Sequence, residues 1–107
     1  MNAITFPTLT EAKIAGFTMD NLWFDENLFD GTGGYALVRS SLTTYAAFRG
    51  ADPVAAIELA LDDGFTLNNY TDNASDVHED CWRGYAEELA ARDPSTFYLT
   101  TTYKITL

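Results

Sequence analysis

The residues best placed by type and spacing to do chemistry are His78 and Cys81, which stand three positions apart. On one helix face such a pair could donate two ligands to zinc, or act as a thiol nucleophile with an imidazole base. Structural zinc takes four ligands, however, and the chain has one histidine and one cysteine in total. A role in or beside the hydrophobic core is the simpler interpretation, so we expect neither a metal ion nor a catalytic pair.

The run Gly31-Thr32-Gly33-Gly34 invites comparison with loops whose backbone amides hold a phosphate. No lysine follows the run, and Asp30 directly before it would repel a phosphate group. An Asp-Gly step is instead typical of the turn between two paired strands. The sequence therefore predicts a hairpin turn at this position.

Acidic side chains offer two further kinds of chemistry. The acids within 25–30 and 72–80 could coordinate calcium, but neither group has the ligand spacing of a calcium-binding loop. Adjacent pairs such as Asp62-Asp63 and Glu87-Glu88 could serve as acid and base, yet neighbouring surface acids are ordinarily solvated. We expect no catalytic residue, no metal site and no cofactor.

Three helices are predicted to position these groups. The clearest one covers residues 53–61, because Asp52 is a favourable N-cap, Pro53 suits the first helical position and Gly64 suits a left-handed turn after the end. A shorter helix is predicted over residues 10–16. The third begins after Ser75 as N-cap and continues to about residue 91, because a residue before proline disfavours helical geometry.

The helix predicted at 75–91 has two faces at 100° per residue. Its apolar face consists of Val77, His78, Cys81, Trp82, Tyr85 and Leu89. Its acidic face consists of Asp76, Glu79, Asp80 and Glu87, grouped around Arg83.

Strands are predicted where β-branched and aromatic residues dominate, at 35–39, 43–48 and 96–107. Residues 21–29 are expected to pair with 35–39 across the glycine-rich turn. In the last strand, alternate residues from Phe97 onward point to one buried face. The predicted fold is α+β: one compact domain over residues 1–107, with an antiparallel sheet of three to five strands and two principal helices packed on one face.

The charge balance excludes two classes of ligand. Sixteen acidic residues against six lysines and arginines give a formal net charge of −10. Binding to nucleic acid or to an anionic membrane surface needs clustered Lys and Arg, which this chain lacks. Hydrophobic residues make up 47% of the chain, enough for a core without disulfides, and no apolar run approaches the roughly 20 residues of a membrane span. We expect an intracellular protein that contacts neither nucleic acid nor membrane.

The negative charge is concentrated in two segments. Residues 1–30 hold five acids against one lysine, and residues 62–93 hold nine acids against two arginines. From Asp76 to Glu87 a helix spans about 16 Å, over which duplex DNA presents about ten charges. The predicted helix face has four acids and one base over that length, so other acids must lie on the same side for the surface to imitate DNA.

A small, strongly acidic chain with carboxylates on one helix face resembles the inhibitors that phages and mobile elements use against host defence, namely anti-CRISPR proteins and antirestriction DNA mimics. The resemblance is one of size and charge. It implies a non-enzymatic inhibitor, in the cytoplasm of a bacterial host, that binds the basic nucleic-acid-binding surface of a defence complex and blocks target DNA. The residues expected to bind this partner are Asp25, Glu26, Asp62, Asp63, Asp72, Asp76, Glu79, Asp80 and Glu87.

Other functions are compatible with the same sequence. An immunity protein or antitoxin would use the same acids to cover a basic nuclease. A small enzyme or metabolite-binding domain would instead have a deep pocket lined by Tyr35, Tyr45 or Trp82. Adaptation to high salt would explain the acidity without any partner.

Overall fold

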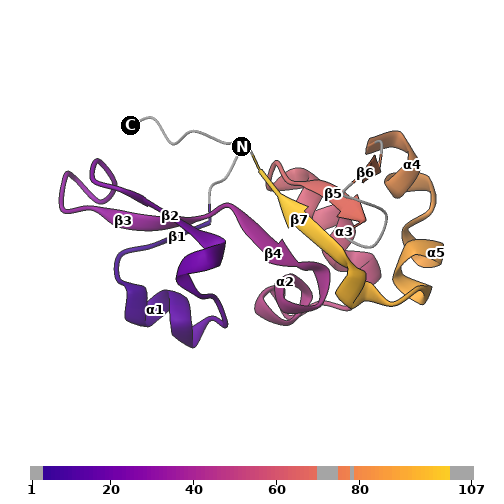
Figure 1. Cartoon of the computed structure of the whole chain (residues 1–107), viewed down its shortest axis with the longest axis horizontal. Helices are drawn as coiled ribbons and strands as arrows, with labels where there is room; N and C mark the ends of the chain where they lie inside the picture. The colour runs from indigo at the N-terminus through magenta and orange to yellow at the C-terminus, as the bar shows by residue number, and fades with distance from the viewer. Residues whose placement is uncertain (1–3, 70–74, 78, 102–107) are drawn as a thin grey trace.

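The computed structural model of the protein describes residues 4–69, 75–77 and 79–101 and has an α+β architecture (Figure 1). Its principal extents are 42 × 24 × 24 Å, so the molecule is elongated. The strands form two antiparallel sheets, one of three strands and one of four. The predicted α+β class is confirmed, although the strands are divided between two sheets where the sequence indicated one.

The first sheet lies in the N-terminal part of the chain. Its order is β1-β3-β2, with β1 at Thr5–Phe6, β2 at Leu22–Asp25 and β3 at Gly34–Leu37. Helix α1 (Leu9–Ile14) and the short helix η1 (Met19–Asn21) connect β1 to β2.

The second sheet has the order β4-β7-β5-β6. Its strands are β4 (Arg39–Ser41), β5 (Thr66–Asn69), β6 (Ser75–Val77) and β7 (Phe97–Thr100). Helices α2 (Leu42–Arg49) and α3 (Pro53–Asp62) follow β4, whereas α4 (Glu79–Gly84), α5 (Ala86–Ala91) and η3 (Pro94–Thr96) precede β7.

Val38 joins the two sheets. It stands between β3 and β4, and its amide donates a hydrogen bond to the Asn21 carbonyl (2.9 Å) at the start of β2. Its carbonyl accepts a bond from the Thr101 amide (3.0 Å), next to β7. The chain therefore passes from one sheet to the other through a residue that is hydrogen-bonded to both.

The hydrophobic core continues from one sheet to the other. The ring of Phe48, on α2, packs against Phe6 (6.0 Å between centroids) and Phe17 (5.1 Å) from the N-terminal part. On the other side Phe48 lies 6.5 Å from Tyr45, which packs on Phe65. Burial of these aromatic rings supplies much of the apolar contact between the two parts of the chain.

The helices predicted at 10–16 and 53–61 are confirmed as α1 and α3. The Asp52 carboxylate accepts a hydrogen bond from the Ala55 amide (2.9 Å), and Pro53 is the first helical residue. Gly64 has φ +86°, the left-handed conformation that a glycine tolerates after a helix end. Local capping signals were sufficient to predict these two helices.

The predicted hairpin and the last strand are also confirmed. β2 pairs antiparallel with β3, and Leu22 stands opposite Leu37. In β7 Phe97 and Leu99 are buried while Tyr98 between them is half-buried, as the alternation predicts. The rest of that predicted strand, residues 102–107, lies outside the described residues.

The strand predicted at 43–48 is wrong, because these residues form helix α2. The Ser41 hydroxyl caps the helix by accepting a bond from the Thr44 amide (3.0 Å), and Gly50 ends it with φ +65°. The buried residues Leu42, Tyr45 and Ala46 follow helical spacing. Capping and burial on one face outweigh the preference of Thr and Tyr for strands.

The single helix predicted at 75–91 is also wrong. Ser75 begins strand β6, which pairs with β5, instead of capping a helix. The helical part is divided into α4 and α5 at Tyr85, whose φ of −116° and ψ of 22° are not helical. Cys81 and Tyr85, expected on the apolar face, are exposed, whereas Trp82 is buried. His78 lies outside the described residues.

Candidate protein-binding surface

Four of the acids predicted to bind a partner lie at two ends of the molecule. Asp25 ends β2 and Glu26 begins the β2–β3 loop, while Asp80 and Glu87 belong to α4 and α5. Figure 1 shows the β2–β3 hairpin and the α4–α5 pair at opposite ends of the longest axis. That axis measures 42 Å, several times the Debye length of about 8 Å at physiological ionic strength. The two groups therefore cannot act as one electrostatic surface.

Asp62 and Asp63, at the end of α3, have different environments. Asp62 is exposed, whereas the Asp63 side chain is only 8% exposed. The Tyr45 hydroxyl donates a hydrogen bond to the Asp63 carboxylate, and Arg49 Nη1 lies 3.8 Å from it. Burial of Tyr45, together with its hydrogen bond to Asp63, raises the pKa of the phenol above its usual range. The Asp63 carboxylate thus stabilises the fold and is not displayed to a partner.

Three of the predicted acids have no described side chain. Asp72 lies outside the described residues. Asp76 belongs to β6 and Glu79 begins α4, and for these two residues the structure describes the backbone alone. Because β6 and α4 are separate elements, these acids do not share one helix face as the sequence indicated.

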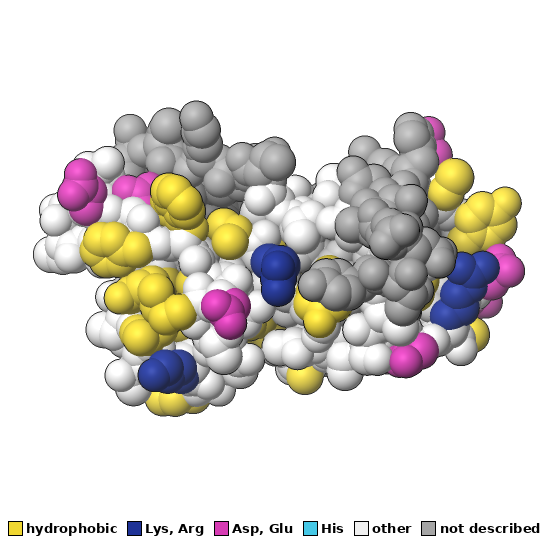
Figure 2. Space-filling model, in the orientation of Figure 1, with side chains coloured by type: hydrophobic (Ala, Val, Ile, Leu, Met, Phe, Trp, Pro, Cys, Tyr) yellow, Lys and Arg dark blue, Asp and Glu magenta, His cyan; other side chains and the backbone are white. Residues whose placement is uncertain are grey.

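The N-terminal part of the molecule has a surface that sequence reasoning missed. Large hydrophobic side chains that the structure leaves exposed gather here: Ile14 (81% exposed), Met19 (50%), Trp23 (66%), Phe24 (51%) and Phe29 (39%). We call these residues, which lie on both faces of the first sheet, the N-terminal patch. Figure 2 shows hydrophobic side chains concentrated on this lobe with acidic ones beside them. Outside the patch, Tyr85 is the other large hydrophobic residue that is exposed among those described.

Two aromatic rings of the patch pack over glycines, which have no side chain. The Phe24 ring packs edge-on against Tyr35 in the neighbouring strand (5.2 Å between centroids). A Cβ on Gly33 would lie 2.8 Å from the Phe24 ring, and a Cβ on Gly34 would lie 2.4 Å from Phe29, both too close. The glycines leave space in which the two rings lie against the backbone, so these exposed rings are preorganised.

The β2–β3 loop has a defined conformation. The Gly33 amide donates to the Leu28 carbonyl (2.9 Å), and the Thr32 hydroxyl donates to the Phe29 carbonyl (2.6 Å). Phe29 and Asp30 have φ of 54° and 59°, a left-handed conformation that costs energy for residues other than glycine. Residues in this conformation occur in tight turns and cluster at functional sites. The expected hairpin turn is thus confirmed, with a strained aromatic residue at its tip.

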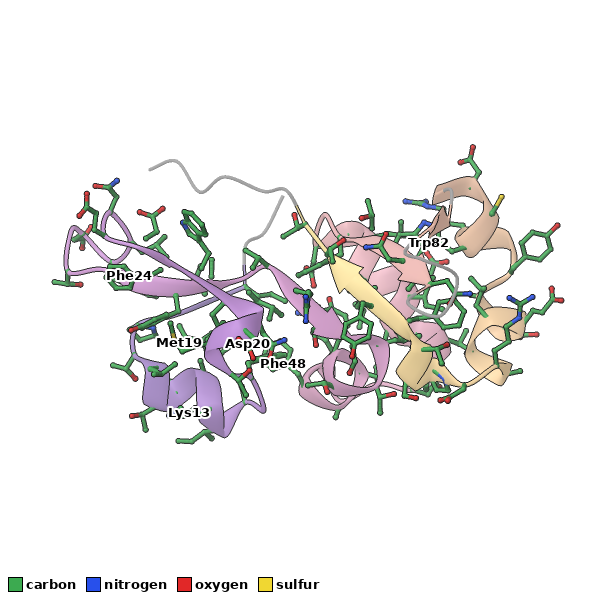
Figure 3. All side chains as sticks on the ribbon, in the orientation of Figure 1. Lys13, Met19, Asp20, Phe24, Phe48 and Trp82 are labelled. Atoms are coloured by element: carbon green, nitrogen blue, oxygen red, sulfur yellow. The ribbon has the colours of Figure 1, made fainter. Side chains whose placement is uncertain are left out.

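Carboxylates surround the N-terminal patch. Asp20, Glu26 and Asp30 are exposed and Asp25 is half-buried, whereas the exposed cations on neighbouring elements are Lys13 on α1 and Arg39 at the start of β4. In Figure 3, Met19, Asp20 and Lys13 lie on the α1 side of the sheet, and Phe24 lies at the level of the hairpin strands. The arrangement combines aromatic side chains with a negative rim, which is suited to a partner that is partly apolar and basic.

The described residues also bear on the alternatives of a metal site and of a ligand pocket. They contain no group of three or more His, Cys, Asp and Glu side chains arranged to hold a metal ion. Tyr45 and Trp82, considered as pocket-lining residues, are 0% and 1% exposed and belong to the core. Across the described parts of the chain, no helix has both the length and the apolar character needed to span a membrane.

The chain matches no protein-family model, no curated protein and no solved structure. The exposed aromatic residues and carboxylates of the chain itself are therefore the evidence that bears on its function.

Proposed function

We propose that this protein is a non-enzymatic inhibitor that docks on the basic, nucleic-acid-binding surface of a host defence complex and blocks its access to DNA. The observation that supports this proposal most directly is the N-terminal patch, where exposed aromatic side chains stand among carboxylates. Exposed apolar clusters with a polar rim mark protein-binding sites, and aromatic residues supply much of the binding energy there.

The net charge of −10 complements this patch. A negative field accelerates encounter with a basic surface and disfavours acidic partners. Nucleic-acid-binding proteins present such basic surfaces, because they must contact many phosphates.

The size of the molecule favours docking at one end over copying a whole duplex. A duplex as long as the 42 Å axis carries about 25 phosphate charges, whereas the full chain has sixteen acids. The partner would therefore be recognised by a local aromatic and acidic surface, with the remaining charge adding long-range attraction.

The proposal is tested by expressing the protein in bacterial strains that each carry one CRISPR or restriction system, and by measuring transformation with a targeted plasmid. We expect transformation to rise in at least one strain. The double variant Asp20→Lys/Glu26→Lys should lower this protection about tenfold or more, because it reverses charge beside the N-terminal patch.

The matched control is Glu87→Lys/Glu88→Lys, which makes the same change in charge at the opposite end of the molecule. It should reduce inhibition far less. Equal losses in both variants would argue against the N-terminal patch as the docking site, and failure to protect any strain would argue against the anti-defence function itself.

A further inference from the structure

Strand β2 forms an open edge of the first sheet. It pairs with β3 on one side, and no described strand lies on its other side. Sheets commonly protect such edges with lysine, proline or a bulge. The opposite edge strand, β1, has two residues and is followed by Pro7, whereas β2 reads Leu-Trp-Phe-Asp. β2 is therefore the edge of this sheet that can accept another strand.

The hydrogen-bond pattern shows which backbone groups face this edge. The bond from the Val38 amide to the Asn21 carbonyl fixes the alternation, so that Trp23 and Asp25 face β3. Leu22 and Phe24 then direct their backbone groups outward. The Leu22 amide already bonds to the Met19 carbonyl, which leaves the Leu22 carbonyl and both groups of Phe24 for an added strand.

The side chains at this edge lie on both faces of the sheet. Trp23 and Phe24 are adjacent in a strand, so their side chains point to opposite faces, and they are 66% and 51% exposed. A strand added at this edge would be contacted by Trp23 on one face and Phe24 on the other. Main-chain bonds would provide affinity and these two rings would select its side chains.

The charge around the edge determines which strand would fit. Asp20 lies two residues before β2, Asp25 ends this strand and Glu26 follows it. The exposed cations on neighbouring elements are Lys13 on α1 and Arg39 at the start of β4. A second copy of this chain would bring identical carboxylates together, which is unfavourable. We propose that the β2 edge binds an extended segment of the partner in which lysine or arginine alternates with apolar residues, a proposal that rests on the proposed function.

The experiment uses a soluble hexapeptide that alternates lysine and valine, with a glutamate–valine peptide as the control ligand. Amide hydrogen exchange and chemical shifts are followed by NMR in the full chain. We expect the lysine peptide to slow exchange of the Phe24 amide about tenfold or more and to shift the Trp23 indole signal. The control peptide should do neither.

Two variants separate strand addition from simple charge attraction. Phe24→Pro removes the outward amide, together with the Phe24 ring, without removing a bond to β3, and Trp23→Ser keeps the backbone but removes one ring. Both should abolish peptide binding, which is followed by the Trp23 indole signal in Phe24→Pro and by exchange of the Phe24 amide in Trp23→Ser. Ile14→Ala, which changes another exposed residue of the N-terminal patch away from β2, should bind normally. Circular dichroism checks that each variant is folded.

Three results of the peptide and sedimentation experiments would overturn this inference. The first is peptide binding that leaves the Phe24 amide unprotected. The second is unchanged peptide binding by both Trp23→Ser and Phe24→Pro. The third is a dimer, seen by sedimentation equilibrium, in which hydrogen exchange shows the Phe24 amide protected without peptide. Full inhibition by Phe24→Pro in the transformation assay would also refute strand addition while leaving the proposed function intact. If Asp20→Lys/Glu26→Lys loses inhibition while Trp23→Ser and Phe24→Pro keep it, the protein docks through charge and not by strand addition.

Discussion

At the scale of single residues, Asp63 illustrates how position in the fold changes the role of a charge. Its neighbour Asp62 is exposed, but Asp63 is enclosed beside Tyr45 and Arg49. A buried carboxylate is costly unless it is paired and hydrogen-bonded, and these two partners meet that requirement. The adjacent pair in the sequence therefore contains one solvated acid and one structural acid.

Replacing Tyr45 by Phe should destabilise the protein at neutral pH by about 1–3 kcal/mol, because the buried carboxylate loses its hydrogen-bond donor. The stability should also depend differently on pH. The pKa of Tyr45 is raised in the folded state, so above about pH 10 the unfolded chain releases a proton that the folded protein keeps. Stability should therefore fall as the pH rises through this range in the native protein, and less so in the variant.

Urea denaturation at pH 8 and pH 11 measures both effects. Tyr85→Phe is the matched control, because Tyr85 is 56% exposed. If the two variants unfold at the same urea concentration at pH 8, the Tyr45–Asp63 hydrogen bond contributes nothing to stability.

At the scale of elements, α2 depends on its cap. Ser41→Ala should lower the free energy of unfolding by about 1 kcal/mol, because the Thr44 amide loses its acceptor. Thr43→Ala, an exposed change inside the same helix, should be neutral or stabilising by about 0.5 kcal/mol. Thermal unfolding followed by circular dichroism compares the two, and an unchanged melting temperature in Ser41→Ala would contradict the capping role.

Elements that are decided by interactions between residues close in the sequence could be predicted, whereas those decided by distant residues could not. α3 was predictable because Asp52 and Pro53 signal its start locally. The same type of signal, Ser41 followed nine residues later by Gly50, is present for α2, but the strand preferences of the residues between them led to the wrong prediction. Ser75 could begin a helix or a strand, and its pairing with Asn69 in β5 decides the outcome. That pairing is a tertiary contact that no local pattern contains.

At the scale of the whole molecule, the sequence predicted how much charge there is but not where it is displayed. Only folding places Glu26 and Glu87 at opposite ends of a 42 Å axis. The N-terminal patch was equally hard to foresee, because Trp23 and Phe24 read as core residues of a strand. Their exposure arises because no described helix covers these parts of the first sheet, which depends on tertiary packing.

The separation of the two acidic ends predicts that they act independently. For the purified defence complex, the combined variant Asp20→Lys/Glu26→Lys/Glu87→Lys/Glu88→Lys should lose a binding free energy equal to the two double-variant losses together, within about 0.5 kcal/mol. Isothermal titration calorimetry at physiological salt measures this double-mutant cycle. A larger coupling would mean that the partner contacts both ends as one connected surface.

The position of Val38 has a consequence for dividing the molecule. Because this residue is hydrogen-bonded to both sheets, and Phe48 packs on Phe6 and Phe17, a break in the chain at this point would leave two fragments with incomplete cores. Each fragment would expose aromatic surface that only the other covers. The protein is therefore suited to a complementation system, in which neither fragment folds alone and function returns when both are produced in the same cell.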